Sequence, residues 1–183
     1  MYYVIQVAPG TESRTEELIR RRVDSGLYGR CFHPLRHMRR KLRGEWRDVH
    51  EKLIPGYVFL TSTSIQELYQ ALRQVPSFTR LLGREEGDLF LPLPEEDALW
   101  LEKATGGGTE APLSLVEVTE GDGIRILSGP LKDMEGYIRK LNLHKRTAEV
   151  EVNFMKQKLL VHLGIEMVGK KVPCNRSRTP QKI

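Results

Sequence analysis

The sequence is poor in cysteine and contains no long apolar segment. Its two cysteines, Cys31 and Cys174, lie far apart without the spacing of metal ligands, so neither a disulfide framework nor a zinc site is predicted. No apolar run reaches the roughly eighteen residues of a membrane helix, and the first residues lack the pattern of a secretory signal. We therefore expect a soluble, cytoplasmic protein with no membrane partner.

Motifs of catalysis are missing as well. The five histidines form no metal-binding spacing with carboxylates or cysteines, and there is no glycine-lysine loop of the kind that cradles phosphates. No serine or cysteine stands in a recognisable nucleophile motif. These absences predict a protein that is not an enzyme and that uses no cofactor or metal.

Positive charge is in excess, and it is unevenly distributed. The net charge of +5 arises in residues 111–183, where 13 basic residues face 8 acidic ones. In the first part, Arg30–Lys52 carries eight basic and three acidic residues, whereas Arg84–Glu102 carries one basic and seven acidic residues. This asymmetry predicts different partners for the two parts, and oppositely charged faces within the first.

The first hundred residues alternate between strand and helix patterns. Strands are predicted at Tyr2–Val7, in a hairpin of Cys31–Leu42 and Trp46–Lys52 around the turn 43–45, at Leu53–Leu60, and in short segments at 78–82 and 88–91. Helices are predicted from an N-cap at Thr11 to Gly26, from a capping box at Ser64 and Glu67 to Pro76, and after Pro94. This order predicts an α+β domain with helices flanking a mostly antiparallel sheet.

A glycine-rich segment precedes a second strand-rich region. Residues 105–112 contain three consecutive glycines, which predicts a flexible linker between domains at 1–104 and 113–168. Strand patterns then recur at the spacing of a small five-stranded β-barrel: 114–118, 123–127, 134–141, 147–154 and 158–162. Gly136 lies inside the third pattern, where glycine indicates a bulge or sharp bend. The basic tail, 169–183, is predicted to be disordered.

Two motifs, in this order, resemble one family. The segment Glu120–Lys140, with its strand at Ile124–Ser128 and the turn that follows, resembles a KOW motif. Ile54–Phe59, together with Tyr2–Gln6 upstream, resembles the N-terminal domain of the NusG transcription factors, and the whole resemblance covers about residues 2–168. It implies a transcription elongation factor whose first domain docks on the clamp helices of the β′ subunit of RNA polymerase.

The resemblance also implies which residues dock on polymerase. Tyr57 and Phe59 match the family's aromatic docking positions, with Tyr2, Pro55 and Leu82 as neighbours. Tyr57 and Phe59 are two residues apart on a predicted strand, so they share one face. Aromatic side chains are good interface anchors, but residues of so apolar a strand also suit a core, and a purely structural role is the alternative.

Three arginines of the first helix are implied to touch DNA. Arg14, Arg21 and Arg22 occupy positions from which relatives contact the exposed non-template DNA strand. A cationic helix face is able to follow phosphates. Because Glu16 and Glu17 lie beside these arginines, a solvated charged helix is the alternative.

The basic second domain resembles that of the specialised LoaP-type antiterminators, which are implied to recognise a hairpin in the nascent leader RNA. Eight basic residues fall at predicted strand ends and turns: Lys132, Arg139, Lys140, His144, Lys145, Arg146, Lys156 and Lys158. If the loops gather at one end of the barrel, these side chains form a basic mouth for RNA phosphates. A soluble basic barrel without an RNA ligand is the alternative.

The combined expectation is a monomeric processive antiterminator that suppresses pausing and termination at specific operons. One domain would hold polymerase while the other holds nascent RNA, and other Nus factors are expected as further partners. A general NusG elongation factor, whose barrel contacts the ribosome or a termination factor, is one alternative. A ribosome-associated KOW protein is another, but it leaves the Ile54–Phe59 motif unexplained.

Overall fold

The computed structural model describes residues 1–76, 80–81, 92–119 and 123–168. The N-terminal elements are β1 (Tyr2–Gln6), α1 (Glu12–Arg22), the 3-10 helix η1 (Ser25–Leu27), β2 (Cys31–Phe32), β3 (Leu35–Leu42), β4 (Glu45–Lys52), β5 (Tyr57–Thr61), α2 (Ile65–Leu72), β6 (Arg80–Leu81), α3 (Glu95–Thr105) and β7 (Glu110–Ala111). The C-terminal elements are β8 (Ser114–Val118), β9 (Ile124–Ser128), the 3-10 helices η2 (Pro130–Asp133) and η3 (Glu135–Tyr137), β10 (Ile138–Asn142), β11 (Thr147–Phe154) and β12 (Gln157–Val168).

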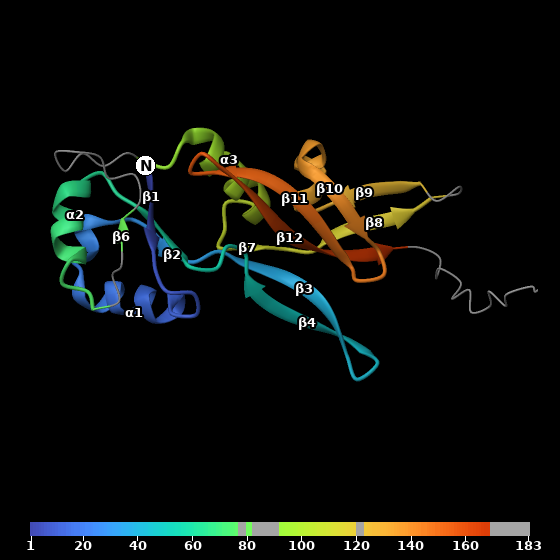
Figure 1. Ribbon diagram of the computed structural model, residues 1–183, viewed down its shortest axis with the longest axis horizontal. Coiled ribbons are helices and arrows are strands. Elements are labelled where there is room, and N and C mark those ends of the chain that lie inside the picture. Colours follow the sequence, from blue (N-terminus) through green and yellow to red (C-terminus); the bar gives the residue numbers. More distant parts are fainter. Residues whose placement is uncertain (77–79, 82–91, 120–122, 169–183) are drawn as a thin grey trace, which may run out of the picture.

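These elements form two β-rich regions at opposite ends of an elongated molecule (Figure 1). The first region, which comprises the described residues up to Ala111, contains an antiparallel sheet in the order β2-β5-β1-β6 and a smaller sheet in the order β4-β3-β7. The second region is a curved five-stranded sheet in the order β10-β11-β12-β8-β9. We call the second region, residues 114–168, the barrel. The prediction of an α+β fold with a small C-terminal barrel is confirmed. The predicted strand at 88–91 and residue Leu82 lie outside the described residues.

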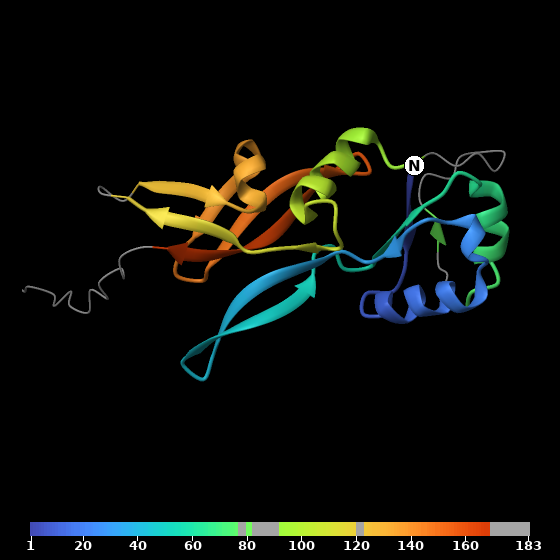
Figure 2. The ribbon, with the colours of Figure 1, turned by 180° about the vertical axis from the view of Figure 1, so that it is seen from behind.

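The two faces of the first sheet are covered by different parts of the chain. Tyr3 and Ile5 of β1, with Val58 of β5, pack into a core with α1 and α2. Val4 and Phe59 belong to a second core, which continues through α3 into the barrel. Neighbouring residues of a strand point to opposite faces, so β1 and β5 contribute to both cores. In Figure 2, α1 and α2 lie away from the barrel, whereas α3 lies beside it.

The basic segment of the first region forms the predicted long hairpin. Strands β3 and β4 pair antiparallel along their whole length. Arg43 and Gly44 at the turn both have positive φ, which a two-residue turn between twisted strands requires. Strand β3 also lies against β12, so the hairpin projects from the first sheet alongside the barrel (Figure 1).

Residues 105–112, predicted to be a flexible linker, contact the hairpin. Thr105 ends α3, and Gly106 and Gly107 take left-handed conformations with φ of 60° and 75°. Strand β7 then pairs in parallel with β3, and the Leu35 amide donates to the Thr109 carbonyl oxygen at 2.8 Å. The glycines therefore reverse the chain after α3, because they adopt a conformation that costs other residues more.

Strand β12 joins the two parts of the barrel sheet and is longer than predicted. Its first part pairs antiparallel with β11, and Ile165–Val168 pair in parallel with Ser114–Glu117 of β8. Apolar side chains of β11 and β12, including Val150, Val152 and Leu163, are buried inside. The predicted strand at 158–162 does not include this second part of β12, because the part is paired with β8, which lies far away in the sequence.

The strand predicted to begin at Met134 is wrong in its first four residues. Two 3-10 helices precede β10, and Gly136 lies in η3, so it marks no bulge. Leu131 and Met134 are fully buried, so this turn packs into the barrel core, which local strand propensity does not reveal. Gly129 has a φ of 89°, and a Cβ there would lie 2.6 Å from the Ser114 Cα, so the turn requires glycine.

The helix starts also differ from prediction. Among the described residues, the Ser64 side chain makes no capping bond to α2, so the predicted capping box is wrong. Its amide instead donates to the Ser62 hydroxyl at 3.0 Å. Thr11 precedes α1 as predicted, but its hydroxyl donates to the Ala8 carbonyl oxygen at 2.7 Å rather than capping the helix. The Thr11 hydroxyl is thus satisfied by a local turn, with which a helix cap competes.

Candidate functional site

The aromatic residues predicted to dock on polymerase face the barrel. The Tyr57 ring meets Phe154 edge-on with centroids 5.1 Å apart, and the Phe59 ring lies 6.0 Å from Phe154 and 5.8 Å from Phe32. Phe59 is fully buried and Phe154 is 6% exposed. Such aromatic pairs add to the stability that burial alone provides. We call this the aromatic contact; in this arrangement Phe154 covers the surface around Tyr57 and Phe59.

The other predicted docking neighbours lie differently. Tyr2 packs edge-on against Phe32 at 6.4 Å, and its hydroxyl accepts a bond from Arg30 at 3.1 Å. Pro55 is exposed in the bend before β5. The fourth neighbour, Leu82, is outside the described residues. Tyr2 therefore lies at the border of the aromatic contact, and Pro55 lies in solvent.

The turn that carries Phe154 is fixed to α3. Met155 and Lys156 both have positive φ, a conformation that is strained for residues other than glycine. The Met155 amide donates to Oδ2 of Asp97 at 2.7 Å, and Asp97 is almost fully buried. A charge-assisted bond to a buried carboxylate is stronger than a neutral one. Helix α3 therefore holds the end of β11 against the first sheet.

A second contact between the first region and the barrel consists of charged groups, and we call it the arginine contact. Arg36 donates to the His162 carbonyl oxygen at 3.1 Å. Glu166 of β12 pairs with Arg39 of the hairpin at 3.2 Å and with Arg146 of the barrel at 2.7 Å. The Arg146 guanidinium also lies 4.2 Å from the centroid of the Trp46 ring, within cation-π distance. One carboxylate and one aromatic ring thus join the hairpin to the barrel.

The backbones approach closely at the arginine contact. A Cβ at Gly164 would lie 2.3 Å from the His37 carbonyl oxygen and 2.5 Å from Leu113 Cδ2. Only glycine fits there without displacing the β3 backbone. β12 and β3 therefore touch through main chain as well as through side chains.

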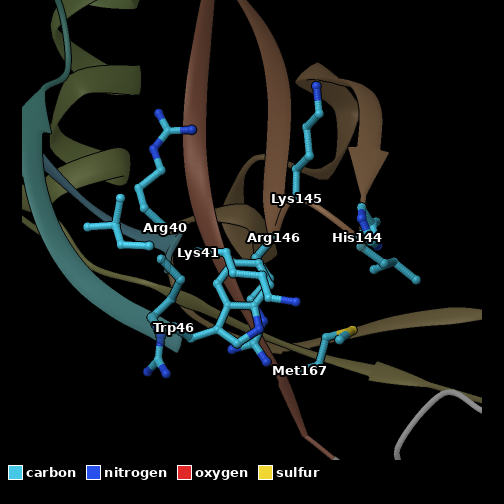
Figure 3. Close-up of a pocket in the computed structure, with 10 residues that line it drawn as sticks. Arg40, Lys41, Trp46, His144, Lys145, Arg146 and Met167 are labelled. Atoms are coloured by element: carbon cyan, nitrogen blue, oxygen red, sulfur yellow. The ribbon is translucent and has the colours of Figure 1, made fainter. Parts of the chain in front are cut away.

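A groove of about 790 Å³ opens beside the arginine contact (Figure 3). One wall is the hairpin and the other is the turn between β10 and β11. Its lining combines basic and apolar side chains: Arg39, Arg40, Lys41, Leu42, Trp46, Leu143, His144, Lys145, Arg146 and Met167. No carboxylate is among these lining residues, so the groove is suited to a ligand rich in hydrogen-bond acceptors.

The charges of the groove are only partly neutralised. Arg40 binds both carboxylate oxygens of Glu51, at 2.8 and 2.9 Å, and these bonds lower the pKa of Glu51 and raise that of Arg40. Arg39 and Arg146 share Glu166. Lys41 and Lys145 are exposed and have no ion-pair partner among the described residues. Two ammonium groups, one on each wall, are therefore available to a ligand.

The eight basic residues predicted to bind RNA do not gather at one end of the barrel. His144, Lys145 and Arg146 lie in the turn before β11, whereas Lys156 lies in the turn after it. Successive turns between antiparallel strands lie at opposite ends of those strands. The prediction that these residues form one basic mouth at one end of the barrel is therefore wrong. Lys132 and Lys140 are exposed on η2 and β10.

Two of the eight are engaged on the barrel's outer surface. Arg139 of β10 and Lys158 of β12 both pair with Glu151 of β11, at 2.8 and 3.0 Å. They neutralise a carboxylate between them and lie apart from the groove lining. Of the eight residues predicted to bind RNA, three line the groove (His144, Lys145 and Arg146), and the other five lie elsewhere on the barrel.

The hairpin side of the groove was missed by the sequence-based assignment. Arg39, Arg40, Lys41 and Trp46 were seen only as part of a basic segment. The charge excess of Arg30–Lys52 was the available signal. The sequence does not indicate that this hairpin packs beside the 143–146 turn, because the two segments are about a hundred residues apart along the chain.

The three arginines of α1 lie on the opposite side of the first sheet from the barrel. Arg14, Arg21 and Arg22 are all exposed. Arg21 pairs with Glu17 at 2.5 Å, one turn away on the helix. Helix α1 therefore presents a mixed-charge surface. The helix lies away from the β3–β4 hairpin that forms one wall of the groove (Figure 1).

Across the described ranges, no three His, Cys, Asp or Glu side chains come together in a way that could hold a metal ion. Within the same ranges, every helix is too short or too polar to cross a bilayer.

The fold defines a class of proteins in which a small barrel follows an α+β region. A solved structure concerning domain interaction in Thermotoga maritima NusG has this fold, with a TM-score of 0.56 and 23% sequence identity. The match covers 89% of this chain and 92% of that one. The likeness therefore extends over both regions.

Sequence comparison identifies the family. The family model described as transcription termination factor nusG matches residues 1–101. The transcription termination/antitermination protein NusG of Thermus thermophilus is 26% identical, covering 92% of this chain and 97% of that protein. The protein of the same name from Vibrio parahaemolyticus is 27% identical, with coverage of 92% and 94%. The chain belongs to the NusG family of transcription termination and antitermination factors.

Proposed function

We propose that this protein is a cytoplasmic processive antiterminator that binds the β′ clamp helices of RNA polymerase and a hairpin of the nascent leader RNA. The observation that carries the proposal is the pair of surfaces described above: an aromatic face at Tyr57 and Phe59, and a basic surface on the barrel. The first suits an apolar protein partner, and the second suits phosphates. Holding both partners would keep the factor at its target operon, where it suppresses pausing and termination.

The aromatic contact adds a condition to polymerase binding. Phe154 occupies the face of Tyr57 and Phe59 that would meet the clamp helices, so the barrel has to move aside before polymerase docks. The apparent affinity for polymerase is then reduced in proportion to the fraction of molecules in which Phe154 has left Tyr57 and Phe59. The α1 arginines and other Nus factors are further proposed contacts within the transcription complex.

Two substitutions on opposite sides of the aromatic contact test the docking assignment. Tyr57→Ala should abolish polymerase binding, because it removes an anchor, whereas Phe154→Ala should strengthen binding, because it weakens the cover. Binding to core polymerase is measured by interferometry, and circular dichroism confirms that both variants are folded. Loss of binding in both variants, or retention by Tyr57→Ala, would reject the docking face.

The RNA part of the proposal is tested by transcription through a terminator. Templates with and without the leader hairpin are transcribed in vitro, and readthrough is expected only when both the protein and the hairpin are present. Readthrough that does not depend on the hairpin would instead support a general elongation factor. Native gel filtration of the free protein tests the proposed monomeric state.

A second candidate function is that of a general elongation factor whose barrel contacts a protein such as a ribosomal subunit. Leu115, Ile124 and Leu127 on β8 and β9 are between 37% and 40% exposed, which suits a protein contact. If this candidate is right, Leu127→Glu should abolish co-sedimentation with ribosomal subunits. If the antiterminator proposal is right, the same substitution should leave hairpin-dependent readthrough unchanged.

A further inference from the structure

We infer that the groove between the β3–β4 hairpin and the β10–β11 turn is a composite binding site for the phosphate backbone of RNA, with one wall supplied by the N-terminal region. The inference rests on the proposed RNA-binding function and assigns it to a specific surface. Its new element is the hairpin wall, which brings Lys41 and Trp46 to the same groove as Lys145.

The two walls present cations toward a shared space (Figure 3). Lys41 and Trp46 are directly paired across β3 and β4, so their side chains stand together on one face of the hairpin. His144 and Lys145 are exposed on the opposite wall. Backbone phosphates of one RNA strand passing between the walls would meet a positive charge on each side.

The groove also has surface for the uncharged parts of a nucleotide. Trp46, Leu42, Leu143 and Met167 lie among the cations. Nucleic-acid grooves that follow a single strand or loop combine cations with aromatic and apolar platforms for sugars and bases. An acidic peptide would use the cations but would gain less from an aromatic platform, so RNA is the favoured ligand.

The walls are held in position by groups that RNA need not touch. Glu166 joins Arg39 to Arg146, and Gly164 lets β12 approach β3 closely. Because these contacts exist without a ligand, the groove is formed in advance, and binding loses less free energy to ordering. The groove lies at the opposite end of β11 from Phe154, so the site does not include the polymerase-docking face.

The test uses the full-length chain and a fluorescently labelled RNA hairpin with an unpaired loop. Lys41→Ala and Lys145→Ala should each weaken binding about fivefold in fluorescence anisotropy, and each should reduce the slope of log affinity against log salt by about 0.7 to 0.9. Lys103→Ala is the matched control, because Lys103 is exposed on α3 and does not line the groove. Tyr57→Ala should bind RNA as the wild type does.

The outcomes separate this inference from the proposed function. If Lys145→Ala weakens RNA binding while Lys41→Ala matches Lys103→Ala, the barrel binds RNA alone and the composite site is wrong. If the wild type does not bind the hairpin at all, the proposed RNA function fails as well. Equal affinity for single-stranded DNA of the same length, or competition by poly-glutamate at equal charge, would overturn the assignment to RNA. Trp46→Phe, which keeps an aromatic ring, should lose less affinity than Lys41→Ala.

Discussion

The first region and the barrel meet in two places that differ in chemistry. The aromatic contact joins Tyr57 and Phe59 to Phe154 and is part of a continuous apolar core. The arginine contact joins Arg39 and Arg146 through Glu166, and its side chains are 15% to 26% exposed. Apolar burial responds little to salt, whereas partly exposed ion pairs are screened. The two contacts should therefore respond to different perturbations, although they connect the same two regions.

The comparison also indicates different roles. The aromatic contact covers the proposed polymerase-docking face, so its strength sets how often that face is exposed. The arginine contact borders the basic groove, so it sets the separation of the groove's walls. A change at one contact that leaves the other intact should alter one proposed partner and not the other.

The largest effect on stability is expected at the aromatic contact. Phe154→Ala should reduce the free energy of unfolding by about 3 kcal/mol, because it removes a buried ring that packs on two others. Chemical denaturation at low and high salt measures the change, which should be the same at both. A loss confined to low salt would mean that the contact depends on charge. Leu160→Ala, on an exposed side chain of β12, is the control.

A smaller effect is expected where the backbones touch. Gly164→Ala should cost about 2 kcal/mol, because the added methyl group would collide with the His37 carbonyl oxygen and force β3 away from β12. Thermal unfolding measures the loss, and RNA affinity should fall with it as the groove widens. Gly136→Ala is the matched control, since a Cβ at Gly136 meets nothing within 4 Å. Equal stability of the two variants would contradict close backbone packing.

The smallest effect concerns the pH dependence of the hairpin. Arg40 lowers the pKa of Glu51 through two hydrogen bonds, and Arg36 adds a third. The contribution of Glu51 is thus complete above its unfolded-state pKa of about 4.3 and is lost as the pH falls through the lower folded-state pKa. Glu51→Gln should remove about 1 kcal/mol at neutral pH and progressively less in acid. Thermal midpoints from pH 7 downward measure this, and parallel curves for the two proteins would contradict it.

Much of the fold was predictable because local patterns and tertiary packing agree. The hairpin turn at Arg43 and Gly44 is encoded by a few neighbouring residues, and the helix after Ser64 has clear apolar periodicity. The start of β10 was not predictable. Met134 is buried in the barrel core as part of a turn, and this tertiary packing outweighs the local strand propensity.

The candidate site was predictable only in part. The side chains of Tyr57 and Phe59 share a face as expected, because strand geometry requires it. Their cover by Phe154 was not foreseen, because it joins residues about a hundred positions apart. The basic groove combines Lys41 with Lys145 for the same reason: charge is visible in a sequence, but the docking of one element beside another is not.

Strand β11 begins directly after Arg146 and ends at Phe154, so it connects the arginine contact at one end to the aromatic contact at the other. At about 3.3 Å per residue, its eight residues place the contacts roughly 26 Å apart. A rotation of roughly 20° about the Arg146 end would carry Phe154 by roughly 9 Å, which is more than an aromatic ring needs to leave its partner. If the barrel rotated in this way, Phe154 would leave Tyr57 while the basic groove beside Arg146 changed little.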